Sequence, residues 1–320
     1  MNINQKLKVV TVTLNPALDL TGSLDVLNTG TVNVIDTGSL HAAGKGINVA
    51  KVLAELGASV TVTGLLGDNN QDAFVHLFDS LDIIDNFVRV NGDTRINVKI
   101  VEKSGQVSDL NFPGMTVSAE DIKRFETQLF SLAETHDVFV IAGSLAKGIS
   151  TNQLKNWIEK LQKAGKKVFF DSSNQALSAG IEAMPFLIKP NDEELSAIVG
   201  EQLTSIDEIK LAAEKLYQQG CENVVISLGE KGVLWLNENG WTQSIPQKMD
   251  VVSTVGAGDT LVAGLCWAEL NKWDKKQGLS FATALAAFAV TQIGVGVKDI
   301  QKVQKMQESI QITTQLTSTR

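Results

Sequence analysis

Short apolar runs rich in β-branched residues alternate along this chain with stretches of helical period, and this alternation constrains the fold more than any other feature. The apolar runs cover residues 9–14, 60–66, 138–142, 168–171, 187–189 and 224–227. The helical stretches cover residues 47–56, 71–79, 121–133, 153–164, 192–199 and 207–219. Buried parallel strands read as continuous apolar runs and need crossover helices between them. The pattern therefore predicts an α/β fold with a doubly wound, mostly parallel sheet flanked by helices.

Two stretches, residues 21–40 and 91–112, interrupt this alternation. They contain short alternating segments at 33–36, 96–101 and 107–111, with no full helix between them. We interpret these segments as antiparallel strands outside the main sheet that pair into a small β lid over a cleft. The chain is then one domain over residues 1–320, with the lid at about 21–40 and 91–112. The polar segment 310–320 is expected to be frayed.

Composition narrows the class of partner. The 320 residues carry 28 basic and 36 acidic side chains, a net charge of -8, and no Lys/Arg cluster. A nucleic-acid partner is therefore not expected. Cys221 and Cys266 lie in no metal-binding spacing, which is typical of a reduced compartment. With no signal sequence and no long apolar span, we expect a cytoplasmic protein without a membrane partner.

The segment from Ser253 to Asp259 is the most informative motif. Gly256, Ala257 and Gly258 precede an apolar helical stretch. Glycines at a helix start let backbone amides converge on an anion, and the helix dipole adds to the attraction. Asp259 would lie beside that anion, where a carboxylate can accept a hydroxyl proton during phosphoryl transfer. The alternative is that Asp259 only caps the helix.

A second glycine segment opens the helix predicted at 47–56. Gly44 and Gly46 flank Lys45, and Asn48 follows within the first turn. Close backbone approach beside an ammonium group suits a sugar phosphate, whereas a packed turn with a solvated lysine is the simpler reading. The sequence matches neither of two common nucleotide-binding motifs, the P-loop and the dinucleotide-binding glycine motif. Neither Gly-Lys pair, at 44–45 or 165–166, precedes Ser or Thr, and neither glycine segment has the third small residue of a dinucleotide site.

Several predicted strands end in small or polar residues. Lys189 and Asn191 follow the strand predicted at 187–189, and Asn191 with Glu194 forms a capping-box pattern. Ser144 and Ser227 end two other strands. Because carboxyl ends of parallel strands share one edge of a sheet, these residues indicate a ligand cleft there.

Seven ordered blocks, spread over nearly the whole chain, together resemble the ribokinase-like (PfkB-type) sugar kinases. Within that family they are most similar to the branch that phosphorylates fructose 1-phosphate. The blocks are residues 13–19, 41–51, 94–99, 142–145, 189–191 with Glu194, 227–229 and 253–259. Seven blocks in the family's order are far more specific than a single glycine motif.

The resemblance implies a role for each matching residue. Asp259 corresponds to the catalytic base, and the backbone of Gly256, Ala257 and Gly258 to the anion hole. The sugar phosphate would be bound by Asp19, Gly44, Asn48, Arg95 and Ser144, with Lys45 and Lys99 as additions. ATP would be bound by Lys189, Asn191, Ser227, Gly229, Ala257 and Gly258, and Mg²⁺ would be associated with Glu194.

The resemblance also implies a reaction and an assembly. ATP would phosphorylate the C6 hydroxyl of fructose 1-phosphate, a small-molecule sugar phosphate, and two copies would form a homodimer through the lid. A kinase for tagatose 6-phosphate or fructose 6-phosphate is the alternative within the family, because the physics of the sequence does not separate these sugars. A noncatalytic sugar-phosphate sensor is the alternative from another class. The presence of Asp259 and of the segment 189–194 argues against it.

Overall fold

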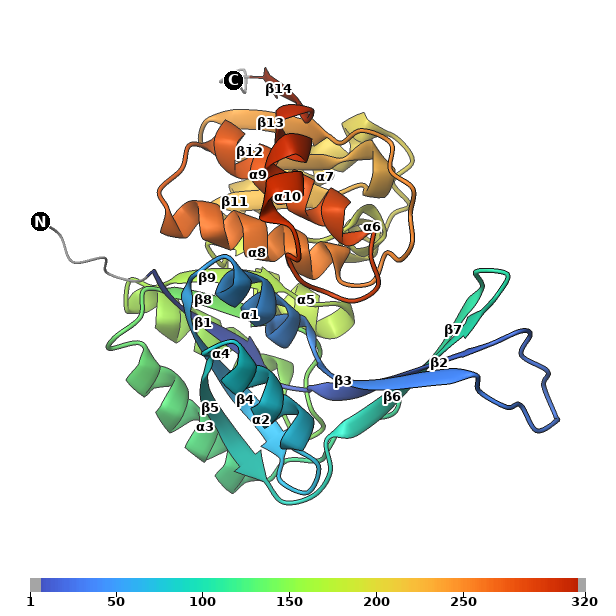
Figure 1. The fold of residues 1–320 in the computed structure, drawn as a ribbon. Helices are drawn as coiled ribbons and strands as arrows, with labels where there is room; N and C mark the ends of the chain where they lie inside the picture. The colour runs from blue at the N-terminus through green and yellow to red at the C-terminus, as the bar shows by residue number, and fades with distance from the viewer. Residues whose placement is uncertain (1–6, 316–320) are drawn as a thin grey trace, which may run out of the picture.

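A ten-stranded sheet forms the centre of the molecule (Figure 1). The computed structural model describes residues 7–315. The strands run in the order β14-β13-β12-β11-β10-β9-β8-β1-β4-β5. Their bounds are β1 (Lys8–Thr13), β4 (Ser59–Gly67), β5 (Ile84–Val90), β8 (Val138–Ala142), β9 (Lys167–Asp171), β10 (Leu187–Ile188), β11 (Asn223–Ser227), β12 (Val233–Asn237), β13 (Gly240–Ile245) and β14 (Gln311–Gln315).

Pairing within this sheet is parallel from β5 to β11 and antiparallel from β11 to β14. The doubly wound, mostly parallel sheet is therefore confirmed, and each predicted strand overlaps an observed one. The strands β5, β12, β13 and β14 were not among those predicted.

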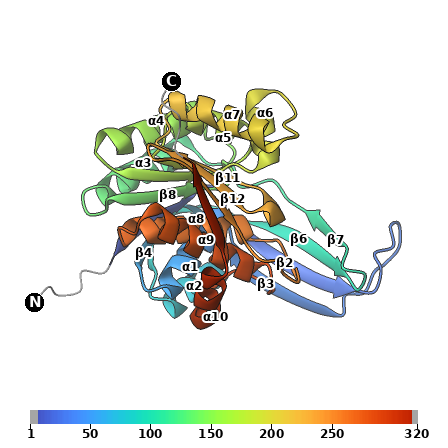
Figure 2. The ribbon, with the colours of Figure 1, turned by 90° about the horizontal axis from the view of Figure 1, so that it is seen from above.

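Helices cover both faces of the sheet, as Figure 2 shows from above. One core contains apolar side chains of α3 to α7, and the other contains those of α1, α2, α8 and α9. Since both faces are covered, the parallel strands are buried on both sides. The helices are α1 (Lys45–Glu55), α2 (Asp72–Ser80), α3 (Ala119–Leu132), α4 (Thr151–Lys163), α5 (Asn174–Ile181), α6 (Asp192–Val199), α7 (Ile206–Gln218), α8 (Ala257–Leu270), α9 (Lys275–Ala289) and α10 (Ile300–Glu308).

Most of the helices on the α3–α7 face begin in the same way. Ser118, Ser150, Asn191 and Ser205 each form a capping box with the residue three positions later. These boxes satisfy amides that would otherwise lack partners at the helix start. Helix α8 differs, because glycine stands at its N-cap and no side chain caps it.

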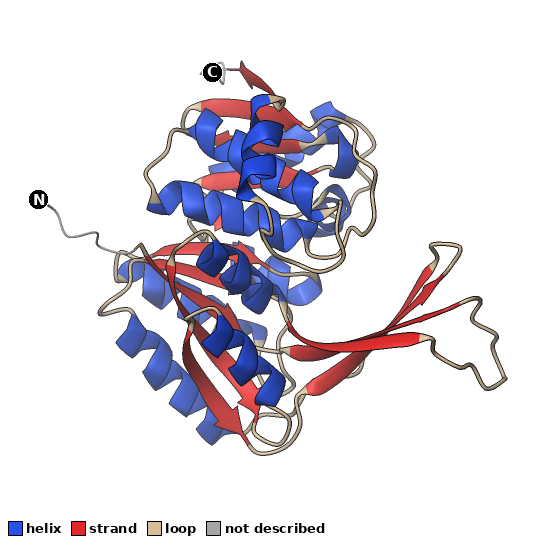
Figure 3. Ribbon diagram, in the orientation of Figure 1, coloured by secondary structure: helices blue, strands red, loops and turns tan. Residues whose placement is uncertain are grey.

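A second, four-stranded sheet projects from the main body (Figures 1 and 3). It consists of β2 (Ala17–Leu24), β3 (Thr37–Ala43), β6 (Arg95–Glu102) and β7 (Val107–Leu110), in the order β3-β2-β6-β7. Two of its pairings are antiparallel, as expected, but the central β2–β6 pair is parallel. The segment 33–36 is not a strand, so that prediction is wrong. The strand begins only at Thr37.

The two faces of this small sheet differ in chemistry. Residues paired directly across strands point to the same face. Leu20 pairs with Leu40 and with Val98, and Val98 pairs with Leu110, so one face is apolar. Asp19 pairs with Asn97 on the opposite, polar face.

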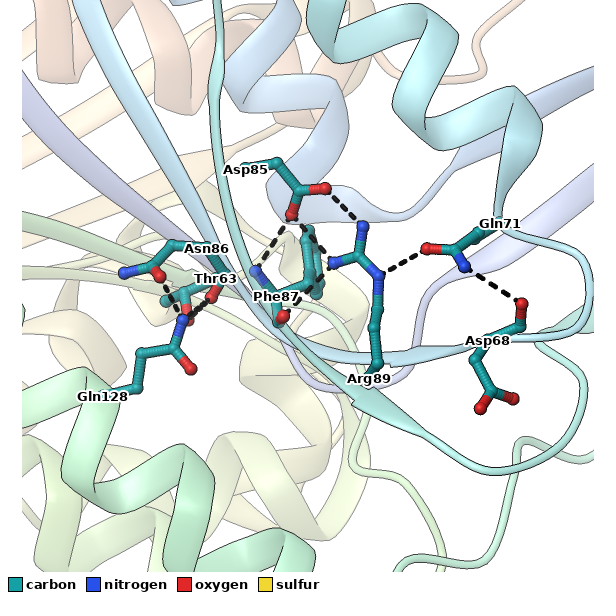
Figure 4. A network of polar contacts seen from close by, with 8 residues as sticks. All are labelled: Thr63, Asp68, Gln71, Asp85, Asn86, Phe87, Arg89 and Gln128. Carbon is teal, nitrogen blue, oxygen red and sulfur yellow. Dashed lines mark hydrogen bonds and ion pairs between the residues drawn. The ribbon is translucent and has the colours of Figure 1, made fainter.

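A network of side-chain hydrogen bonds surrounds β5, the edge strand of the main sheet, as Figure 4 shows. Gln128 donates to the backbone carbonyl of Asn86, which also accepts from Thr63 (2.8 Å). Arg89 donates to the Phe87 carbonyl (3.2 Å) and pairs with Asp85 (2.5 Å).

Strand β14 forms the other edge of the main sheet. The prediction that segment 310–320 is frayed is therefore wrong for residues 311–315. They pair with β13 along five residues because backbone hydrogen bonds, not apolar side chains, hold an edge strand. Of the remainder of that segment, the Ile310 amide donates to the Gln307 carbonyl at the end of α10 (3.2 Å), and residues 316–320 lie outside the described residues. Over residues 7–315, no helix combines the length and apolar character needed to span a bilayer.

Candidate active site

The start of α8 presents backbone amides to the carboxyl edge of the main sheet. Gly256 has φ 79°, and a Cβ there would lie 2.2 Å from the Val295 side chain, so only glycine fits. The Ala257 amide donates to the Thr254 carbonyl (3.3 Å). Within residues 7–315, the amides of Gly256, Gly258 and Asp259 donate to no protein acceptor. These three donors suit an anion.

Asp259 does not cap its helix. Its carboxylate instead accepts a hydrogen bond from Asn48 Nδ2 of α1 (2.7 Å). The residue is only 7% exposed. Burial, together with the negative charge of Asp171, raises the pKa of Asp259 to about 6, although the Asn48 hydrogen bond and the charges of Lys45 and Lys189 oppose the rise. A carboxylate with this pKa is ionised at neutral pH and basic enough to take a proton.

Asp171, at the end of β9, holds the two lysines of the site. Its carboxylate lies 3.3 Å from Lys45 Nζ and 3.5 Å from Lys189 Nζ, and it is 1% exposed. Burial alone would lower the pKa of Lys45, but the charges of Asp171, Asp259 and Glu194 raise it above the ordinary value. Lys45 is therefore cationic, and the Asp171 carboxylate holds both lysines beside Asp259. A Cβ on Gly258 would lie 3.5 Å from Lys189 Nζ, so this lysine reaches the start of α8.

The residues predicted for the nucleotide lie on neighbouring strand ends. Asn191 and Ser227 form a parallel bridge, and the Ser227 amide donates to the Pro190 carbonyl (3.1 Å). Gly229 follows directly, in a left-handed conformation (φ 58°), at the start of a short 3₁₀ turn. The predicted capping box is confirmed: Asn191 Oδ1 accepts from the Glu194 amide (2.6 Å), and Glu194 Oε2 accepts from the Asn191 amide (3.0 Å).

The residues predicted for the sugar phosphate lie where the small sheet meets the main sheet. Asn15 Nδ2 donates to Ser144 Oγ (2.9 Å), which joins the end of β1 to the end of β8. Arg95 donates to the carbonyls of Asn15 (3.2 Å), Pro16 (3.3 Å) and Phe112 (3.2 Å). Its partners are neutral, and no carboxylate in the described part of the chain lies within 4.0 Å of it. The guanidinium charge is therefore available to an anion.

On the polar face beside Arg95, Asp19 accepts a hydrogen bond from Asn97 Nδ2 (3.1 Å). Burial lowers the pKa of Arg95, and the Asp19 charge opposes that effect. Lys99 does not join this group. Four residues of strand carry it about 13 Å beyond Arg95, and it pairs with Asp109 of β7 (3.2 Å).

The two glycine segments thus meet, because Asn48 of one hydrogen-bonds Asp259 of the other. Gly44 caps α1 with φ 142°, and a Cβ there would lie 2.8 Å from the Thr13 side chain. The sequence reasoning missed Asp171, Asn15 and Asn97. Asp171 ends a predicted parallel strand, so the rule that strand ends share one edge was the signal that could have found it.

The carboxyl edge of this doubly wound sheet brings together a buried carboxylate, two fixed lysines and the open amides of a helix start. This arrangement is typical of a kinase that lacks a P-loop. The family model "pfkB family carbohydrate kinase" matches residues 11–302. The chain belongs to this family of carbohydrate kinases.

Individual proteins agree with this assignment. The chain is 57% identical over 306 residues to a 1-phosphofructokinase of Vibrio cholerae, covering 96% of each chain. It is 45% identical to a 1-phosphofructokinase of Escherichia coli K12, covering 95% of this chain and 98% of that protein. Among solved structures, phosphofructokinase-2 of E. coli in complex with fructose-6-phosphate superposes with a TM-score of 0.87 at 27% identity. The superposition covers 94% of this chain and 98% of that chain. That enzyme has also been solved in a tetrameric inhibited form.

Proposed function

We propose that this chain transfers the γ-phosphoryl group of ATP to the C6 hydroxyl of fructose 1-phosphate, giving fructose 1,6-bisphosphate and ADP. The observation that carries the proposal is the buried Asp259 carboxylate beside the open amides of Gly256 and Gly258. The choice of sugar is supported by the relatives named 1-phosphofructokinase, which match nearly the whole chain.

In this mechanism Asp259 accepts the proton of the attacking C6 hydroxyl. The oxygen then bonds to the γ-phosphorus as the bond to ADP breaks. The amides at the start of α8 stabilise the negative charge on the equatorial oxygens. We assign the anion hole to the amides of Gly256 and Gly258. Ala257 lies in the turn between them, and its own amide is bonded to the Thr254 carbonyl. Asn48 orients the carboxylate through its 2.7 Å hydrogen bond.

The sugar phosphate lies between the two sheets. Arg95 pairs with the resident phosphate, since its charge has no carboxylate partner in the described chain. Hydroxyl groups of the sugar are bound by Asp19, Ser144 and Asn48, and Gly44 allows close approach. The small sheet acts as a lid whose polar face closes on the sugar and excludes water.

ATP and Mg²⁺ would be held at the adjoining strand ends. The nucleotide would be held by Lys189, Asn191, Ser227, Gly229 and the α8 start at Ala257 and Gly258. Glu194 fits a role with Mg²⁺, because one carboxylate oxygen accepts the Asn191 amide while the other makes no hydrogen bond within residues 7–315. When bound, Mg²⁺ offsets negative charge on the phosphates. Because ATP is the co-substrate and both cysteines are buried free thiols, we place the reaction in the cytoplasm.

An assay that couples ADP release to a spectroscopic signal tests the substrate. Fructose 1-phosphate, fructose 6-phosphate and tagatose 6-phosphate are compared at equal concentration. We expect the highest kcat/KM for fructose 1-phosphate, and at least tenfold less for unphosphorylated fructose, because Arg95 loses its partner. A higher kcat/KM for fructose 6-phosphate or tagatose 6-phosphate would identify the chain as a kinase for that sugar. If no sugar caused ADP release, the noncatalytic sugar-phosphate sensor would be supported instead.

We further propose a homodimer formed through the lid. Its apolar face carries Leu20, Leu40, Ile96 and Leu110, which are 39%, 47%, 40% and 57% exposed. Such a contiguous apolar face is typical of a protein interface, and a second copy supplies the same self-complementary surface. Sedimentation should show a dimer for the wild type and a monomer for Leu40→Lys, while Lys103→Glu at the sheet's far end stays dimeric. A monomeric wild type at micromolar concentration would refute this assembly.

A further inference from the structure

A cavity of about 760 Å³ lies at the edge of the main sheet opposite Asp259. Two of its residues are at the starts of strands whose other ends form the proposed active site. Lys167 begins β9, which ends at Asp171, and Asn223 begins β11, which ends at Ser227. Strands of five residues span about 13 Å. The cavity is therefore separate from the substrate cleft, and the proposed kinase reaction makes no use of it.

The walls of this cavity are aromatic. Phe186, Tyr217, Trp235 and Trp273 line it together with the apolar side of α8. Phe186 packs against Phe169 (5.4 Å between ring centroids), and Trp273 packs edge-on against Phe281 (5.2 Å), so both rings are held by the core. Trp235 Nε1 donates to Asn223 Oδ1 (3.0 Å), which fixes that indole as well. Rigid aromatic walls suit a planar ring.

One cation in the wall lacks an anionic partner. Lys275 Nζ donates to Asn237 Oδ1 (2.9 Å) and to the Gly240 carbonyl (2.7 Å), both neutral, and lies 5.3 Å from the centroid of the Trp235 ring. Within residues 7–315, no carboxylate lies within 4.0 Å of Lys275. An ammonium group has three donors, so one remains for a ligand.

Of the other charged residues that line the cavity, Glu222 and Glu238 are exposed, and the remaining three are already paired within the protein. Lys167 pairs with Glu269 (2.5 Å), and Asp274 accepts the Gln277 amide (2.9 Å) at the start of α9. Lys275 is the first residue of α9, where the helix dipole disfavours a positive charge. Burial lowers the pKa of Lys275 to about 7. The protein alone thus leaves this ammonium poorly compensated, and an anion would supply the missing charge.

We propose that this cavity binds a small organic anion that carries an aromatic ring, with Lys275 as the partner of its carboxylate or phosphate. The ring lies against Trp235 and its aromatic neighbours, and the head group accepts the third Lys275 donor. The site is distinct from the sugar and nucleotide sites. Its existence does not depend on which sugar the enzyme phosphorylates.

Calorimetry on the full chain tests the proposal with phenylacetate and phenyl phosphate as probes. Benzyl alcohol represents the aromatic ring without an anionic group. Acetate and inorganic phosphate represent the two anionic groups without a ring. We expect a Kd on the order of 1 mM for at least one aromatic anion, and at least tenfold weaker binding of each of these three compounds. The probe that binds more tightly identifies the head group as carboxylate or phosphate.

Two neighbouring lysines give a matched comparison. Lys275→Met should weaken the aromatic anion at least tenfold, as expected for loss of a charged hydrogen bond, whereas exposed Lys276→Met should leave the Kd unchanged. The melting temperature and kinase turnover of each variant report whether the fold is intact. Equal Kd values for the two variants, or no binding by the wild type below 20 mM (roughly 2 kcal/mol of affinity), would overturn the proposal.

A third variant leaves Lys275 in place. Glu222 is exposed at the rim of the cavity, and Glu222→Lys replaces a repelling charge by an attracting one. The Kd of the aromatic anion should fall about two- to fivefold, with a smaller effect at high salt. An unchanged or weaker Kd would place the anion elsewhere.

Discussion

The two sheets of this protein position functional residues in different ways. The parallel strands of the main sheet are buried on both faces, so polar groups reach the cleft only where strands end, as Asp171 and Lys189 do. In the described part of the chain the small sheet is covered on neither face by a helical layer, and Asp19 and Arg95, proposed to bind the sugar phosphate, lie on its polar face. The polar side chains of the proposed site are therefore confined to one edge of the main sheet, whereas in the small sheet they lie on an open face.

This difference separates the expected roles. Charges at the buried edge act in a low-dielectric setting, where a neighbour changes the pKa of Asp259 and where fixed dipoles stabilise a transition state. Charges on the open sheet lie at a hydrated surface, so we expect them mainly to bind substrate. Changes at the edge should lower turnover, whereas changes on the lid face should raise KM.

The largest effect is expected for Asp259→Asn. Asparagine keeps the shape of the side chain but accepts no proton, so kcat should fall about 100- to 10,000-fold while substrate binding is retained. Steady-state kinetics with fructose 1-phosphate measure the change. Asp207→Asn, at an exposed position in the first turn of α7, is the matched control. Near-normal turnover in Asp259→Asn would remove this residue as the base.

The same substitution should stabilise the fold at high pH. The pKa of Asp259 is raised from 3.8 to about 6 in the folded state, so ionisation opposes folding as pH rises through this window. The variant should gain about 3 kcal/mol in the free energy of unfolding at pH 8 and nothing at pH 3.5. Urea denaturation at the two pH values measures the gain. A variant less stable than the wild type at pH 8 would mean that the protein compensates the buried charge.

On the lid face, Arg95→Ala should raise KM for fructose 1-phosphate about 10- to 100-fold and change kcat much less. Lys99→Ala is the control on the same face of the same strand. It should change KM less than about threefold, because Lys99 pairs with Asp109. Arg95 also binds three backbone carbonyls, so melting curves must accompany the kinetics. If Lys99→Ala had the larger effect, the resident phosphate would lie further out on the lid.

Local patterns predicted the parts of the fold and site that depend on neighbours in sequence. Continuous apolar runs predicted the parallel strands, and glycines before an acid predicted the open helix start at Asp259. Asp171 was missed because its lysine partner on α1 lies 126 residues away, a contact that only the sheet order creates. Strand β14 was missed because its polar side chains carry no signal of the backbone pairing that holds it.

The smallest effect expected is a displacement of the acid limb of the pH profile of kcat/KM, which reports the pKa of the free base. The Asn48 hydrogen bond lowers the pKa of Asp259, so Asn48→Ala should move the limb to higher pH by about one unit. Asp171→Asn removes a charge that raises this pKa and leaves Lys45 and Lys189 without their partner. Its limb should therefore move to lower pH. The position of the limb separates this electrostatic role from lost binding, which lowers the whole profile without displacing it. If the acid limbs of the Asn48→Ala and Asp171→Asn profiles moved in the same direction, the assignment of the acid limb to Asp259 would be contradicted.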